Sequence, residues 1–127
     1  MRRDIEFTND GVTLRGWLYV PDSGTAPHPA VVMAHGFTGL KEMTLDRYAE
    51  VFCAAGLAVL VYDNRCLGAS EGEPRHDIDP VAQFRDYRAA VSFAAAQAEV
   101  DAARIGAWGT SYTGGTVLKL AAIDRRV

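Results

Sequence analysis

The sequence predicts an α/β fold: a mostly parallel sheet with helices on both faces and an antiparallel hairpin at its N-terminus. Two short runs of uninterrupted apolar residues, 30–34 and 58–62, are typical of parallel strands that are buried on both faces. Between them, residues 41–55 carry apolar side chains at helical spacing. Upstream, residues 4–8 and 12–20 alternate polar and apolar side chains, as strands with one solvent-exposed face do.

The first two strands are predicted to pair as a hairpin, because Asn9, Asp10 and Gly11 between them form a strong turn signal. A loop with three prolines and a glycine follows at 21–29 and leads into the first parallel strand. The helix after that strand is predicted to end at Gly56. Its apolar face comprises Leu45, Tyr48, Val51 and Phe52.

A longer helix is predicted to begin with Asp79 as its N-cap, since Pro80 then occupies the first helical position, where its missing N–H costs nothing. A third parallel strand, 104–108, and a last helix, 111–122, complete the chain. We expect residues 1–127 to form a single domain. The buried face of the longer helix comprises Val81, Phe84, Tyr87 and Val91.

The composition limits the classes of function. With 49% hydrophobic and 23% charged residues, the chain is typical of a globular domain. Its net charge of -3 and the lack of a basic run argue against nucleic-acid binding. No stretch approaches the ~18 apolar residues of a membrane span, and residues 1–6 lack the apolar core of a signal peptide, so the expected compartment is the cytoplasm. Cys53 and Cys66 form neither a disulfide framework nor a metal-binding pair.

A strand-to-helix turn at residues 108–115, Trp-Gly-Thr-Ser-Tyr-Thr-Gly-Gly, is the most informative part of the sequence. On such a turn Ser111 would be held on a strained backbone with its hydroxyl exposed. Gly109, Gly114 and Gly115 would give the strand and the helix room to cross. An ordinary glycine-rich turn, with Ser111 as a helix cap, remains the alternative from these residues alone. A phosphate-binding loop is excluded, because Gly115 stands where the GxxxxGK[ST] motif has its lysine.

Two further segments follow the predicted parallel strands, at the edge of the sheet where α/β proteins form ligand sites. The glycines of the first, His-Gly-Phe-Thr-Gly at 35–39, would let the loop turn so that the Phe37 N–H faces the space above Ser111. Together with the Tyr112 N–H it would form a pair of oxyanion donors. We expect His35 to hydrogen-bond nearby backbone and to hold this loop.

The second segment covers residues 62–70. Asp63 and Arg65 are expected to act as a pair that fixes the shape of the loop rather than contacts a substrate. Cys66 is interpreted as a half-buried structural thiol and not as a nucleophile. No metal site is predicted, because a recognisable ligand spacing is missing among His35, Asp63, Cys66 and His76.

Taken together, these segments resemble the α/β-hydrolase family, and their order and spacing look like those of its dienelactone-hydrolase-like and acyl-peptidase-like members. The resemblance implies an incomplete α/β-hydrolase fold in which Ser111 is the nucleophile and the N–H groups of Phe37 and Tyr112 form the oxyanion hole. It also implies acyl-enzyme chemistry on a small ester, thioester or amide, without a metal or organic cofactor. The supporting loop residues are then His35, Gly36, Asp63 and Arg65. The matching motifs are His35-Gly36-Phe37, Tyr62-Asp63-x-Arg65-x-x-Gly68-x-Ser70 and Gly109-x-Ser111.

Two residues depart from the family pattern. Cys66 stands where a glycine is usual in the Asp-x-Arg-Gly loop, a position whose backbone angle is costly for other residues if it requires a positive φ. Thr113 stands at the last glycine of Gly-x-Ser-x-Gly, where Gly114 and Gly115 beside it could absorb the crowding.

A serine hydroxyl needs a base to remove its proton and an acid to orient that base, and in this fold both follow the serine. Residues 112–127 contain Asp124, which we expect on the surface at the end of the last helix, about 20 Å from Ser111. The triad acid and base are therefore expected outside this chain. The general base is not expected among the histidines, all of which precede the serine: His28, His35 and His76.

The predicted strand 104–108 would be left as an open, apolar edge of the sheet. We therefore expect the chain to be the N-terminal half of a hydrolase domain, with this edge covered by the rest of that domain or by self-association. The first functional hypothesis is a serine hydrolase that acts on a small acyl substrate. The second is a non-catalytic module of the same fold that binds a partner through the open edge.

Overall fold

A five-stranded sheet in the order β1-β2-β4-β3-β5 forms the centre of the computed structural model, which describes residues 1–127. Strands and helices follow one another along the chain in the order that the sequence predicts. Their bounds are β1 (Arg2–Asn9), β2 (Val12–Tyr19), β3 (His28–Ala34), α1 (Leu45–Ala54), β4 (Ala58–Tyr62), α2 (Pro80–Ala95), β5 (Val100–Gly109) and α3 (Tyr112–Ile123).

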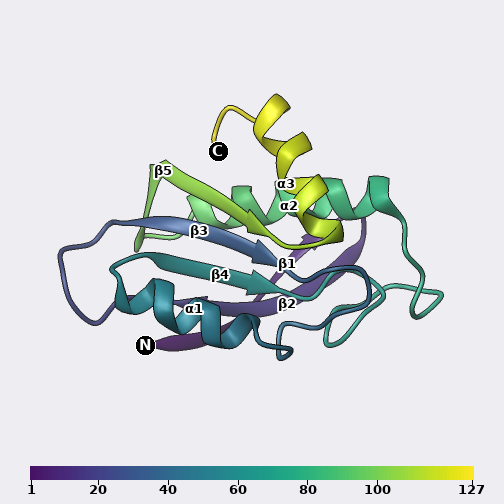
Figure 1. Ribbon diagram of the computed structural model, residues 1–127, viewed down its shortest axis with the longest axis horizontal. Coiled ribbons are helices and arrows are strands. Elements are labelled where there is room, and N and C mark those ends of the chain that lie inside the picture. Colours follow the sequence, from purple (N-terminus) through teal and green to yellow (C-terminus); the bar gives the residue numbers. More distant parts are fainter.

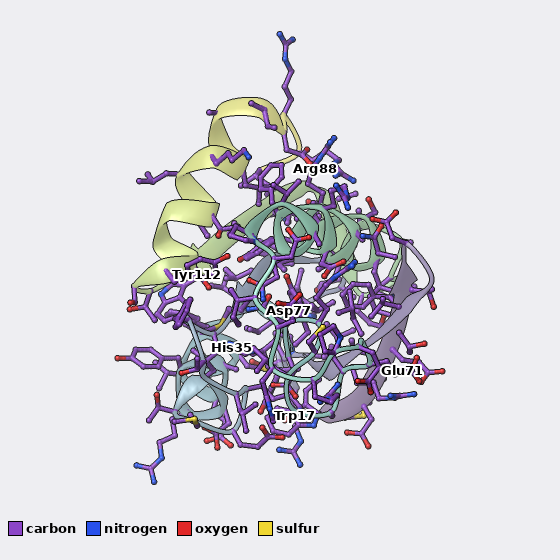
Figure 2. The ribbon with its side chains drawn as sticks, turned by 90° about the vertical axis from the view of Figure 1, so that its right-hand side faces the viewer. Trp17, His35, Glu71, Asp77, Arg88 and Tyr112 are labelled. Atoms are coloured by element: carbon purple, nitrogen blue, oxygen red, sulfur yellow. The ribbon has the colours of Figure 1, made fainter.

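The sheet is mixed, and its parallel part lies at one side. β1 pairs with β2, and β2 with β4, in the antiparallel sense, whereas β3 is parallel to both β4 and β5. The predicted fold class and the N-terminal hairpin are therefore confirmed. Because β3, β4 and β5 run in the same direction, their carboxyl ends lie at the same end of the sheet. Figure 2 looks onto this end, with His35 and Tyr112 labelled.

Helices cover both faces of the sheet, with α1 on one face and α2 and α3 on the other (Figure 1). The larger core lies under α2 and α3, where 18 buried residues gather, and a smaller one of 6 lies under α1. The hydroxyl of Tyr87 on α2 is 2.6 Å from the Val32 carbonyl oxygen and 2.8 Å from that of Trp108. Tyr87 thus links β3 and β5, the two strands that lead into the predicted site.

The buried face of α1 differs from the prediction. Leu45 and Ala49 are buried, but Val51 is 66% exposed and Tyr48 is 49% exposed. The reason is that α1 packs mainly on β4, so that only a narrow stripe of the helix meets the sheet. The ring of Tyr48 lies beside the sheet instead, 5.3 Å from the ring of Trp108.

The helix starts are partly as predicted. The first helix begins at Leu45 rather than at residue 41, because Thr44 has a left-handed φ of 73° and residues 41–44 form turns. The Asp79 carboxylate accepts hydrogen bonds from two N–H groups of the first turn of α2, which confirms the predicted cap. Val81 in that turn is 57% exposed, so the prediction that it belongs to the buried face is wrong.

Candidate active site

Ser111 lies between the end of β5 and the start of α3, with φ 54° and ψ −124°. This combination is rare for a residue with a side chain and costs about 1–3 kcal/mol of backbone strain. The Ser111 side chain is exposed and makes no capping hydrogen bond to α3. The alternative interpretation, an ordinary turn whose serine caps the helix, is therefore wrong.

The close crossing of β5 and α3 explains the glycine at position 109. A Cβ atom on Gly109 would lie 2.6 Å from the backbone oxygen of Thr113. At Gly114 an added Cβ would make only an ordinary contact of 3.6 Å, and at Gly115 it would meet nothing within 4 Å. The strand and helix therefore need the room at Gly109 alone, and the prediction that Gly114 and Gly115 also supply it is wrong.

Alanine substitutions at two of these glycines should have opposite effects on stability. Gly109→Ala is expected to lower the free energy of unfolding by about 3 kcal/mol, because its Cβ would strike backbone that cannot move aside. Gly115→Ala is expected to raise it by about 0.5–1 kcal/mol, since alanine is the better helix former and the space is open. Urea unfolding of both variants measures the difference. Equal stability of the two would contradict the crossing geometry.

The loop that follows β3 reaches the exposed serine. A Cβ atom added to Gly36 would lie 3.6 Å from the Cβ of Ser111, so the two backbones are in contact distance. The rings of Phe37 and Tyr112 pack edge to face with centroids 5.7 Å apart. Neither the Phe37 N–H nor the Tyr112 N–H is a donor among the backbone hydrogen bonds of the turns, loops and helix caps. One of these N–H groups belongs to the residue after Ser111 and the other to the loop that contacts the serine turn, and N–H groups without acceptors can stabilise an oxyanion if they face it.

His35 is part of the scaffold of this loop. Its side chain is 2% exposed and both ring nitrogens face backbone: Nδ1 is 2.8 Å from the Gly36 carbonyl oxygen, and Nε2 accepts from the Asn64 N–H at 3.0 Å. With Nε2 as acceptor, Nδ1 carries the proton and donates it to Gly36. A trans peptide points its N–H away from its C=O. Holding the Gly36 carbonyl therefore sets the direction of the Phe37 N–H.

The neutral form of His35 makes stability depend on pH. Burial lowers the pKa of His35 below its usual range, although the nearby Gly36 carbonyl and Asp63 oppose the shift. As the pH falls from 7.5, the unfolded chain takes up a proton near pH 6.5 before the folded chain does. The free energy of unfolding should therefore fall between pH 7.5 and 5.5, and less steeply in His35→Asn. Urea unfolding at both pH values measures this, and identical slopes would contradict it.

Asp63 and Arg65 do not pair with each other, which corrects the prediction for the loop after β4. The fully buried carboxylate of Asp63 accepts from the Lys41 N–H at 2.8 Å, the Lys41 ammonium at 2.7 Å and the Ala69 N–H at 2.9 Å. Arg65 instead makes two hydrogen bonds of 2.6 Å to buried Asp86 on α2. Each residue still fixes its loop, but to a partner from another segment.

Lys41 is a site residue to which no pattern in the sequence points. Its side chain is 5% exposed, and its ammonium lies 2.6 Å from a Glu42 carboxylate oxygen as well as beside Asp63. Burial disfavours the charged ammonium, but the hydrogen bonds to Asp63 and Glu42 outweigh it and raise the pKa of Lys41. The ammonium also lies 4.8 Å from the ring centroid of Trp17 on β2.

Comparison with known proteins identifies the family. The model of the X-Pro dipeptidyl-peptidase (S15) family matches residues 10–126, which include the serine turn and both loops. The chain belongs to the S15 family. Its structure matches the crystal structure of the α/β hydrolase GrgF from Penicillium sp. sh18 with a TM-score of 0.94 and 40% identity, covering 100% of this chain and 43% of that one. It therefore has the N-terminal part of the α/β-hydrolase fold, as predicted.

Two curated proteins resemble this S15 chain along nearly its whole length. It is 46% identical to the thiohydrolase aneE of Aspergillus aculeatus over 125 residues, 98% of this chain and 38% of that protein. It is also 46% identical to the polyketide transferase af380 of Aspergillus fumigatus over 127 residues, 99% of this chain and 42% of that protein. The S15 chain thus spans about two-fifths of the length of these relatives.

The two departures from the family pattern have different consequences in the S15 chain. Cys66 has a φ of 66°, which confirms that a non-glycine residue occupies a costly backbone angle there. Its side chain is buried, not half-buried, and burial raises the pKa of the thiol, as expected for a structural cysteine. Thr113 is 2% exposed and donates its hydroxyl proton to the His35 carbonyl oxygen.

The other titratable candidates lie in three different segments of the structure. His28 is buried at the amino end of β3, the end opposite to the loop of Phe37, and His76 is exposed in the loop before α2. Asp124 is 4% exposed, which corrects the expectation of a surface residue. Its carboxylate is held by Arg126 at 2.6 Å and Arg88 at 3.2 Å, and these hydrogen bonds keep its pKa well below its usual range.

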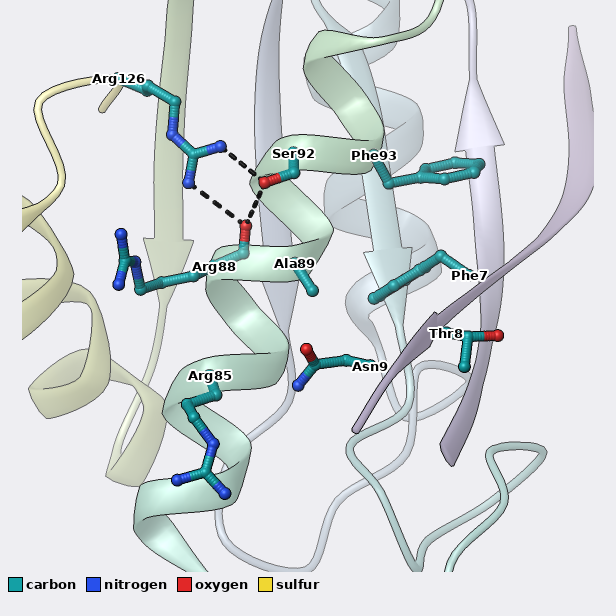
Figure 3. Close-up of a pocket in the computed structure, with 9 residues that line it drawn as sticks. All are labelled: Phe7, Thr8, Asn9, Arg85, Arg88, Ala89, Ser92, Phe93 and Arg126. Atoms are coloured by element: carbon teal, nitrogen blue, oxygen red, sulfur yellow. Dashed lines mark hydrogen bonds between the residues drawn. The ribbon is translucent and has the colours of Figure 1, made fainter. Parts of the chain in front are cut away.

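Two cavities differ in their relation to Ser111. One of about 320 Å³ lies between the serine turn at Thr110, the loop after β3 at Gly36 and the start of α1, and its apolar lining includes Met43, Tyr48 and Trp108. Another, of about 560 Å³, lies between β1 and α2, away from the serine (Figure 3). Ser111 itself lines neither cavity, but the smaller one is lined by Thr110, its neighbour in the chain.

The larger cavity is lined by three arginines that already have carboxylate partners. Arg85 pairs with Asp10, while Arg88 and Arg126 share Asp124.

No three His, Cys, Asp or Glu side chains of the protein gather in a way that could hold a metal ion. No helix has both the length and the apolar character needed to cross a membrane.

Proposed function

We propose that this S15 chain carries the nucleophile and the oxyanion hole of a serine hydrolase, with Ser111 as nucleophile and the N–H groups of Phe37 and Tyr112 as donors. The observation that carries the proposal is the exposed Ser111 on a strained turn, with N–H groups that make no hydrogen bond in the next residue, Tyr112, and at Phe37 in the loop that contacts the turn. Asp63 and Arg65 hold the surrounding loops, and His35 sets the direction of the Phe37 N–H. The triad acid and base come from outside these 127 residues.

The reaction follows from this geometry. The Ser111 oxygen attacks the carbonyl carbon of the substrate while the base takes its proton, and the negative charge that forms on the carbonyl oxygen is bound by the two N–H groups. Collapse of this intermediate releases the protonated leaving group and leaves an acyl-serine. Water, activated by the same base, then releases the acid and restores the hydroxyl.

The substrate class is an ester, thioester or amide, and a thioester is favoured. This preference comes from the relative named a thiohydrolase, which is 46% identical to the chain. The apolar wall of the cavity beside Thr110 and Gly36 suits a hydrophobic part of such a substrate.

A fluorophosphonate probe on the full-length protein tests the proposal. The probe should label Ser111 in the wild type and label nothing in Ser111→Ala, because only a serine activated by a base reacts readily. Peptide mapping locates the label. Labelling at another residue would refute the role of Ser111, while the 127-residue chain alone should show little or no turnover.

A second candidate function is a non-catalytic module that binds a partner through the sheet. β5 is the last strand of the sheet and has one edge without a neighbour. Leu118 on α3, the helix that packs against β5, is 75% exposed. We propose that the rest of a hydrolase domain, or a second copy, covers this edge. Light scattering at several dilutions would contradict this if the chain stayed a soluble monomer.

A further inference from the structure

The hydroxyl of Thr113 forms a direct hydrogen bond between the serine turn and the loop after β3. Thr113 lies in the first turn of α3, and its Oγ1 donates to the His35 carbonyl oxygen. Both residues are only 2% exposed, so water cannot easily replace either partner. The bond joins segments that are 78 residues apart in the sequence.

This hydrogen bond joins two residues that are close along the chain to the two proposed oxyanion donors. Tyr112 directly precedes Thr113, and Phe37 follows His35 by two residues. The Phe37 and Tyr112 rings also touch, but Phe37 is 56% exposed, so their contact restrains the loop weakly. Donors of this kind act only within about 0.5 Å of the productive geometry. A buried bond beside both amides is therefore well placed to fix their separation.

The rest of the Thr113 side chain is fixed by packing. A Cβ atom added to Gly109 would lie 2.9 Å from the Thr113 methyl group, so this methyl rests directly over the strand end. A branched side chain packed in this way has little rotational freedom, and its hydroxyl stays aimed at the loop. A glycine at position 113, the usual residue of the Gly-x-Ser-x-Gly motif, could not make this bond.

We propose that Thr113 is a positioning residue whose hydroxyl sets the spacing of the Phe37 and Tyr112 amides in the transition state. The proposal rests on the proposed serine-hydrolase function. In this proposal Thr113, which departs from the Gly-x-Ser-x-Gly motif, affects kcat rather than substrate binding, because the oxyanion forms only during the reaction.

Two variants that differ by one hydroxyl test the proposal in the full-length protein. Thr113→Ser keeps the donor, and Thr113→Ala removes it with the same loss of the methyl group. Hydrolysis of an acyl thioester should show kcat of Thr113→Ala lower than that of Thr113→Ser by about tenfold, with KM within twofold, since the donors are displaced but still present. Thr116→Ala, one turn further along α3, is the matched control and should keep the wild-type kcat.

The outcomes separate this proposal from the function on which it rests. Equal kcat values in the two variants, or a change confined to KM or to the thermal unfolding midpoint, would overturn the role of Thr113 and leave the function of Ser111 intact. Turnover in Ser111→Ala above about a tenth of the wild-type rate would overturn both. A kcat loss in Thr113→Ala that Thr113→Ser does not share supports the proposal.

Discussion

Replacing Ser111 by alanine is expected to lower ester and thioester turnover of the full-length protein by about 10⁴-fold or more, because no acyl-enzyme can then form. The measurement is the steady-state kcat on an acyl thioester. The remaining rate would come from binding and from the two oxyanion donors alone. Because the side chain of Ser111 is exposed and makes no capping bond, the variant should fold as the wild type does.

The matched control for this loss is Ser23→Ala. Ser23 is also exposed, but it lies in the loop before β3, away from the serine turn. It should keep the wild-type kcat, and both variants should keep the wild-type unfolding midpoint. A Ser111→Ala protein that retained more than about a tenth of the turnover would exclude a covalent role for this residue.

Replacing Asp63 by alanine is expected to lower the free energy of unfolding by about 3–5 kcal/mol, the usual cost of leaving the partner of a buried charge unpaired. The carboxylate is fully buried and holds the Lys41 ammonium at 2.7 Å and two backbone N–H groups. Its loss would free both the loop of Phe37 and the loop of Arg65. Urea unfolding with linear extrapolation gives the difference.

Two further variants define the cause of that loss. Asp77→Ala removes an exposed carboxylate from the loop after β4 and should change stability by less than about 0.5 kcal/mol. Adding Lys41→Met to Asp63→Ala should restore part of the stability, because the unpaired ammonium is gone. If Lys41→Met lowered the free energy of unfolding as much in Asp63→Ala as it does in the wild type, the two residues would not be coupled.

The parts of the molecule that depend on local pattern were predictable from the sequence. Short apolar runs such as residues 58–62 identify the buried strands, and Asp79 with Pro80 identifies the start of α2. The turn at Ser111 is also local, because a strand, small residues and a helix follow one another within a few positions. Such features follow from nearest neighbours along the chain.

The contacts that assemble the site come from residues far apart in the sequence, and no periodicity encodes them. Lys41 meets Asp63 across 22 positions and Arg65 meets Asp86 across 21, so the pairing of Asp63 with Arg65, which are neighbours in the chain, is the wrong guess from sequence. The exposure of Val51 has the same origin, since helical spacing shows which residues share a face but not how wide a stripe the sheet covers.

The most direct test of the central claim mixes the full-length protein with a slowly hydrolysed acyl thioester and quenches the reaction rapidly. The mass of the intact protein is then measured by mass spectrometry. The account predicts a transient mass increase equal to one acyl group, mapped to the peptide that contains Ser111 and lost as free acid appears. Turnover without any acylated species, or acylation mapped to another side chain such as Cys66, would contradict it.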